Sequence, residues 1–110
     1  AAFGIIGLET ALPLSIYLLL HSKVISRTRL VELMTYGPAR VFNLDRMNLG
    51  SLKKGSPADF VIIDPNSKIK VDMDLIRSKS VNTPFMGWEL PGQIKSTWIK
   101  GSKVWGVTEV

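Results

Sequence analysis

The sequence predicts an α+β fold in which helices precede strands. Apolar side chains in residues 10–43 recur at the three- and four-residue spacings of helices. Residues 60–105 instead contain short β-branched runs bounded by Pro and Gly. The period changes near residues 43–48, so we expect one unit at residues 1–43 and a second at 44–110. The first should hold two helices and a short third, and the second about four strands.

The first predicted helix spans about residues 10–21. Thr10 is placed to cap its amino end, and Pro13 is tolerated in the first turn. The segment is apolar nearly all round, which is typical of a helix that packs on several sides. We therefore expect residues outside this chain to cover part of it. The predicted helix of about 12 residues is too short to span a membrane, which takes roughly 20 residues.

A second helix is predicted from Ser26, as its N-cap, to about Thr35. Leu30, Leu33 and Met34 should face inward, because they are three and four residues apart. We expect Gly37 to end this helix. Pro38 should then begin a short third helix that runs to about Asn43.

The strand predictions rest on short apolar runs. Residues 60–63 form a continuous apolar run between Pro57 and Pro65, which predicts a strand buried on both faces. Residues 69–71 alternate as in a short edge strand. Residues 94–99 and 104–105 predict a hairpin that turns at Gly101-Ser102, and residues 73–92 should be mostly loop.

Composition excludes several classes of protein. The 110 residues are 45% hydrophobic and 21% charged, which is typical of a globular chain. The net charge of +5 is spread over separate turns and strands rather than gathered on one face, so we expect no nucleic-acid partner. The absence of Cys fits a reducing cytoplasm. No signal peptide or membrane segment is predicted.

The residues needed for hydrolytic chemistry are not gathered in this chain. A catalytic zinc site needs several imidazole or carboxylate ligands, but His21 is the only histidine and none of the Asp residues has a histidine partner. No Ser lies in a nucleophile motif. Gly4 and Gly7 match neither of the Gly-rich phosphate-binding patterns. We therefore assign no catalytic and no metal-binding residue here.

Four sequence blocks resemble one family in the same order along the chain. They are Gly4-Ile5-Ile6-Gly7-Leu8-Glu9-Thr10-Ala11-Leu12-Pro13-Leu14, Thr35-Tyr36-Gly37-Pro38-Ala39-Arg40-Val41-Phe42, Gly55-Ser56-Pro57-Ala58-Asp59-Phe60-Val61-Ile62-Ile63-Asp64, and Asn82-Thr83-Pro84-Phe85 with Gly87-Trp88-Glu89-Leu90. Together they closely resemble the C-terminal quarter of bacterial class I dihydroorotases. The third block is shared across the amidohydrolase superfamily, and the first is also similar to allantoinases. The last looks like dihydroorotase in particular.

The resemblance implies a fold, an enzyme and a site. Residues 1–43 would be the last loop and helices of a (β/α)₈ amidohydrolase barrel, and 44–110 part of a small composite β-domain. The parent would be a zinc-dependent hydrolase of cyclic amides whose metal ligands and catalytic Asp precede Ala1. By resemblance, the step Ala2-Phe3-Gly4 touches the substrate, so Phe3 and Gly4 are the expected substrate-binding residues. Asn82, Thr83, Trp88 and Glu89 are expected to be structural, in a loop held between the barrel and the β-domain with Trp88 as its hydrophobic anchor.

The implied reaction interconverts N-carbamoyl-L-aspartate and L-dihydroorotate in cytoplasmic pyrimidine synthesis. The expected partners are this small-molecule substrate, the remainder of the polypeptide, further copies of the protein, and aspartate carbamoyltransferase. Two alternatives stay open. One is an allantoinase-type ureide hydrolase, and the other is a dihydroorotase-like subunit that serves only as a scaffold.

Overall fold

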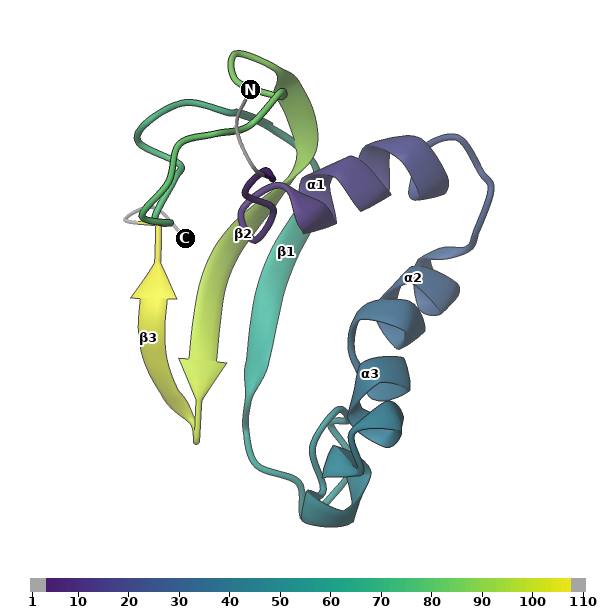
Figure 1. Cartoon of the computed structure of the whole chain (residues 1–110). Coiled ribbons are helices and arrows are strands. Elements are labelled where there is room, and N and C mark those ends of the chain that lie inside the picture. Colours follow the sequence, from purple (N-terminus) through teal and green to yellow (C-terminus); the bar gives the residue numbers. More distant parts are fainter. Residues whose placement is uncertain (1–3, 108–110) are drawn as a thin grey trace.

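A computed structural model describes residues 4–107 and shows a helical layer followed by an antiparallel sheet of three strands (Figure 1). The strand order in the sheet is β1-β2-β3, so β2 is central. The elements in chain order are α1 (Ala11–Ser15), the π-helix η1 (Ile16–Leu20), α2 (Arg27–Met34), α3 (Tyr36–Val41), the 3₁₀-helix η2 (Leu44–Met47), β1 (Phe60–Lys70), β2 (Glu89–Ile99) and β3 (Ser102–Gly106).

The first predicted helix is confirmed as α1 and η1, which follow each other without a break. Thr10 occupies the N-cap position, but its side chain does not cap the helix. The Thr10 hydroxyl instead donates to the Gly7 carbonyl at 3.5 Å, and the residue is buried. Pro13 lies in the first turn, where a missing N–H leaves no intrahelical bond unmade.

The second helix begins as predicted, because the Ser26 hydroxyl accepts a hydrogen bond from the Arg29 amide at 3.1 Å. Its predicted end at Gly37 is wrong, since α2 stops at Met34 and Gly37 lies inside α3. Pro38 is the third residue of α3 rather than the first. All first-turn amides lack intrahelical acceptors, so proline is accommodated at either position.

Fewer apolar side chains of α2 are buried than predicted. Leu30 is buried, whereas Leu33 is 44% exposed and Met34 40% exposed. The reason is that α2 and α3 lie beside the β1 edge of the sheet and do not pack tightly on it (Figure 1).

The two strands predicted around Pro65 are one strand, β1. It pairs with β2 on both sides of an irregularity between Asp64 and Lys68. The Asp64 carboxylate holds this bend, because it accepts from the Asn66 amide at 2.9 Å, the Ser67 amide at 3.2 Å and the Ser67 hydroxyl at 2.7 Å. These hydrogen bonds hold the pKa of Asp64 below its ordinary value, the Ser67 hydroxyl having the largest effect.

The prediction that residues 60–63 are buried on both faces is wrong within this chain. Val61 and Ile62 are each 46% exposed. β1 is an edge strand here, and neither of its faces is fully covered by the helices.

The hairpin is confirmed, with its turn one residue earlier than predicted. β2 ends at Ile99, and the turn residues Lys100 and Gly101 have φ values of +50° and +79°. Both values lie in the left-handed region that a two-residue hairpin turn needs. The Lys100 amide donates to the Asp59 carboxylate at 2.8 Å, which fixes the turn to the start of β1. Since β2 starts at Glu89, residues 89–92 are strand rather than loop.

The core lies where α1 and η1 cross the central strand (Figure 1). Ile16, Val71 and Leu90 are almost completely buried there. Gly92 of β2 permits this contact, because a Cβ at that position would stand 2.6 Å from Cδ1 of Ile16.

Candidate functional site

Of the two predicted substrate-binding residues, the structure places Gly4, whereas Phe3 lies outside the described residues. Gly4 is exposed and has a φ of +83°, a conformation that side chains with a Cβ rarely adopt. Apart from Gly4 and its two chain neighbours, no residue of the described chain has an atom within 4 Å of the position a Cβ would take. Within this chain, glycine is therefore favoured at position 4 by its backbone angle and not by a close neighbour.

Asn82 ties the Gly4 segment to the loop that precedes β2. Its side-chain amide donates to the Gly4 carbonyl, and its own carbonyl accepts from the Ile6 amide at 2.9 Å. Gly4 and Asn82 are 78 residues apart in the sequence. Asn82 therefore joins its loop to the backbone on both sides of Ile5.

Glu9 makes a second tie, which the sequence analysis missed. Its Oε1 atom accepts from the Arg77 amide at 2.8 Å, the Ser78 amide at 2.7 Å and the Ser78 hydroxyl at 2.8 Å. The Ser78 hydroxyl also lies 2.9 Å from Oε2. The only available signal was one carboxylate in an otherwise apolar block, and that signal does not identify a partner.

These donors affect the titration of Glu9. The Ser78 hydroxyl first, and then the Arg77 amide, hold the pKa of the Glu9 carboxyl below its ordinary value, and partial burial opposes them. Glu9 is therefore ionised at neutral pH and makes charge-assisted hydrogen bonds.

Besides the hydrogen bonds of Glu9 and Asn82, the loop between Asp72 and Glu89 is held by backbone bonds between Val71 and its last residues. The Gly87 amide donates to the Val71 carbonyl at 2.7 Å, and the Val71 amide donates to the Trp88 carbonyl at 2.8 Å. The Trp88 ring meets that of Phe85 edge-on, with 5.1 Å between their centroids, but remains 46% exposed. Backbone bonds thus close the end of this loop next to β2, and within the described chain Trp88 is only half covered.

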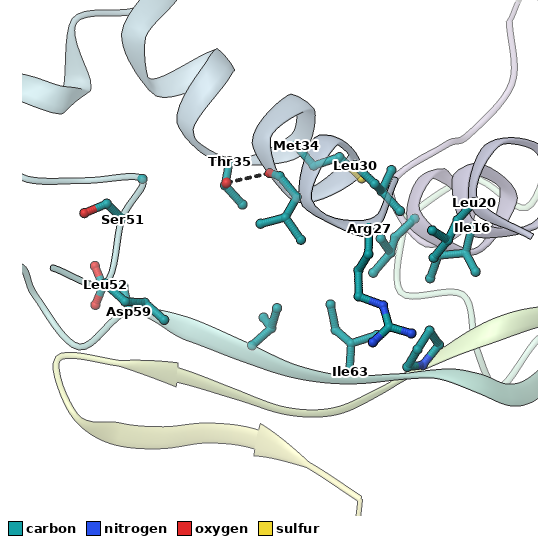
Figure 2. Close-up of a pocket in the computed structure, with 15 residues that line it drawn as sticks. Ile16, Leu20, Arg27, Leu30, Met34, Thr35, Ser51, Leu52, Asp59 and Ile63 are labelled. Carbon is teal, nitrogen blue, oxygen red and sulfur yellow. Dashed lines mark hydrogen bonds between the residues drawn. The ribbon is translucent and has the colours of Figure 1, made fainter. Parts of the chain in front are cut away.

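Two cavities flank the sheet, and Gly4 lines neither. The first, of about 760 Å³, lies between α2 and β1. Figure 2 shows Arg27 extending from α2 across this cavity toward the strand that carries Ile63. Its other lining side chains are mostly apolar. The second cavity, of about 680 Å³, lies beneath the loop that follows β1 and is lined in part by Glu9 and Arg77.

Residues 4–107 contain no group of three or more His, Cys, Asp and Glu side chains that could hold a metal. His21 is exposed at the end of η1. Asp59, Asp64 and Asp72 each accept hydrogen bonds from nearby backbone amides instead. The described residues therefore do not fit a zinc site. No helix among them is both long and apolar enough to span a bilayer.

Comparison with known proteins decides the family. The family model described as "Amidohydrolase family" matches residues 5–104, which include Glu9, residues 77–82 and most of the sheet. The chain belongs to the amidohydrolase family.

This amidohydrolase chain is similar to several proteins named dihydroorotase. It is 46% identical over 101 residues to that of Geotalea daltonii, covering 92% of the chain and 23% of the relative. Identity is 43% over 102 residues with that of Geobacter metallireducens and 44% over 105 residues with that of Pelobacter propionicus. The amidohydrolase chain thus spans about a quarter of the length of these relatives.

A solved structure supports the same family. The L-hydantoinase (dihydropyrimidinase) of Arthrobacter aurescens superposes with a TM-score of 0.86 at 35% identity. The match covers 100% of this amidohydrolase chain and 24% of the hydantoinase chain. The arrangement of helices and sheet described above is therefore that of a segment of a larger amidohydrolase.

Proposed function

We propose that this chain is the C-terminal quarter of a dihydroorotase, which interconverts N-carbamoyl-L-aspartate and L-dihydroorotate. The observation that carries this proposal is the 43–46% identity to three dihydroorotases over more than 90% of the chain. The match includes both the helical part and the sheet. It exceeds the 35% identity to the hydantoinase, although the two folds superpose closely.

In this proposal residues 1–43 are the end of the catalytic barrel, and residues 44–110 belong to the small β-domain. Phe3 and Gly4 contact the ring of the substrate. The exposure of Gly4 supports this role, because backbone groups at a barrel mouth can pair with the amide edge of a planar ring, and the Gly4 carbonyl keeps a second lone pair beside the one that accepts from Asn82. Asn82 and Glu9 hold the loop from the other side.

The zinc expected for this family is proposed to be held by the remainder of the polypeptide, because the described residues offer no ligand cluster. Zinc would supply an activated water for attack on the cyclic amide. The present chain contributes substrate-contacting backbone and the packing that positions it. Cytoplasmic location, self-assembly and association with aspartate carbamoyltransferase belong to the same proposal.

A hydantoinase-type activity is the second candidate, favoured by the TM-score of 0.86 to the hydantoinase structure. Both activities open a cyclic amide, so the fold alone does not separate them. The two candidates differ in the substrate. Dihydroorotate has a six-membered ring that carries a carboxylate, whereas hydantoin has a five-membered ring without one.

The test is an assay of the complete protein that contains this chain. Purified protein is offered dihydroorotate, N-carbamoyl-aspartate, hydantoin and allantoin separately, each with and without prior chelation of metal. We expect turnover of the first two that is lost on chelation. Turnover of hydantoin or allantoin alone would reassign the substrate. A folded protein inactive on all four would support the scaffold alternative.

A further inference from the structure

Two ties join residues 4–9 to residues 77–82, and the paired residues are 68 to 78 positions apart in the sequence. One is the pair of hydrogen bonds between Asn82 and the backbone of Gly4 and Ile6. The other joins the Glu9 carboxylate to the amides of Arg77 and Ser78 and to the Ser78 hydroxyl. The segment that begins at Gly4 is thus held at both ends by residues 77–82.

We propose that Glu9 and Asn82 are positioning residues, which orient the Gly4 backbone toward the substrate by fixing residues 4–9 on residues 77–82. This inference rests on the proposed function, in which the Gly4 backbone meets the ring. Neither side chain is proposed to touch the substrate.

The physical need for such ties comes from Gly4 itself. Glycine has the largest choice of backbone conformations, and a φ of +83° is only one of them. A free Gly4 would lose this conformational entropy each time the substrate bound. Ties that hold the loop beforehand remove that cost from binding, which is the general basis of preorganisation.

The two ties suit this task in different ways. The Asn82 bonds lie directly on both sides of Ile5, so they set the direction of the Gly4 carbonyl. The Glu9 bonds are charge-assisted, and they involve backbone amides that side-chain changes at positions 77 and 78 would leave in place. Glu9 therefore fixes the position of residues 4–9 relative to residues 77–82. Asn82 fixes the orientation of the peptide group between Gly4 and Ile5.

The test uses the complete protein with Glu9→Ala, Glu9→Gln, Ser78→Ala and Asn82→Ala. Glu9→Gln keeps an oxygen that can accept from the Arg77 and Ser78 amides, whereas Glu9→Ala keeps none. Glu32→Gln is the matched control, because Glu32 is an exposed carboxylate of α2 that pairs only locally, with Arg29.

We expect Glu9→Ala and Asn82→Ala each to raise KM for dihydroorotate about tenfold while kcat changes less than about twofold, as for a loss of uniform binding. Glu9→Gln and Ser78→Ala should each stay within about threefold of wild type, and Glu32→Gln should be unchanged. Hydrogen exchange of residues 4–9 and 76–83 should be faster in Glu9→Ala and Asn82→Ala than in wild type.

The outcomes separate this inference from the function on which it rests. Wild-type protein without dihydroorotase activity overturns both. An active wild type with unchanged KM in Glu9→Ala and Asn82→Ala overturns the positioning role alone, even if exchange becomes faster. Should Glu9→Ala fail to fold, Asn82→Ala decides, and a KM that stays at the wild-type value overturns the proposal.

Discussion

At the residue scale, Gly4 is the position where backbone conformation and proposed substrate contact coincide. Its φ of +83° would strain any side chain with a Cβ, although the described chain leaves space around it. Gly7 lies in the same loop, also with free space but without a positive φ. The same substitution at Gly4 and at Gly7 therefore distinguishes the effect of backbone strain from the effect of adding a side chain to this loop.

Replacing Gly4 with Val in the complete protein should lower kcat/KM at least about tenfold, or about 1.4 kcal/mol of transition-state stabilisation. The β-branched side chain strains the loop and occupies the space proposed for the ring. Steady-state kinetics and metal analysis check this, with metal content expected to be unchanged. Gly7→Val is the control and should stay within about twofold of wild type. Normal kinetics for Gly4→Val would remove the substrate role of this loop.

The lowered pKa of Glu9 predicts how its tie responds to acid. Because folding lowers this pKa, the ionised carboxylate stabilises the folded protein above its unfolded pKa of about 4.3. That contribution is lost as the pH falls through the lower pKa of the folded state. The wild type should therefore unfold at a higher temperature than Glu9→Gln, by a margin that is constant above about pH 5 and shrinks below about pH 4.3.

Thermal unfolding of both proteins between pH 6 and pH 3 measures this margin. Asp64 also has a lowered pKa, but it is present in both proteins, so its effect cancels in the difference. A margin that widens as the pH falls would contradict the assignment of an ionised Glu9 to this tie.

At the scale of elements, the packing of α1 and η1 on β2 depends on Gly92. The backbone there has a φ of +105°, and a Cβ would stand 2.6 Å from Cδ1 of the buried Ile16 and 3.6 Å from Cα of Pro13. The helix can approach the central strand this closely only because position 92 has no side chain.

Gly92→Ala should therefore destabilise the protein by about 1–3 kcal/mol more than Gly55→Ala, because it adds overpacking to backbone strain. Gly55 is the matched site, since it has a φ of +94° but nothing within 4 Å of its Cβ position. Denaturant unfolding of the two variants measures the difference in the free energy of unfolding. Equal losses would mean that Ile16 moves aside without cost.

At the scale of the whole molecule, the chain is less compact than its size requires. Its accessible surface is 8137 Å², whereas a compact monomer of 12.2 kDa has about 6,100 Å². Its radius of gyration is 15.1 Å, against about 13 Å for a compact domain of this length. The excess surface includes large apolar side chains, among them Leu8 at 90% exposed.

The isolated 110-residue chain should consequently bind a hydrophobic dye or associate with other copies. The exposed apolar side chains include Tyr17 and Leu18 in η1, Val41 at the end of α3 and Phe42 directly after it, a set that a soluble monomer rarely keeps exposed together. Analytical ultracentrifugation and dye fluorescence test this. A compact monomer that binds no dye would show that the chain is a self-sufficient domain.

The sequence by itself determined the order of helices and strands, the cap at Ser26 and the family. Helical periodicity, a capping hydroxyl and a Gly-containing turn act over a few residues, so they can be read without knowing the fold. The family blocks were readable because they are contiguous. Local signals also led to errors of one to three residues, as at Gly37 and at the Lys100-Gly101 turn.

Only the tertiary structure decided the partners of Glu9 and Asn82, the continuity of β1 through Pro65 and the contact that requires Gly92. Each depends on which distant segments the topology brings together, across 68 residues for Glu9 and Arg77 and 78 for Asn82 and Gly4. It also decided the exposure of Val61 and Ile62, because an apolar run specifies a need for burial and the surrounding elements determine whether that need is met.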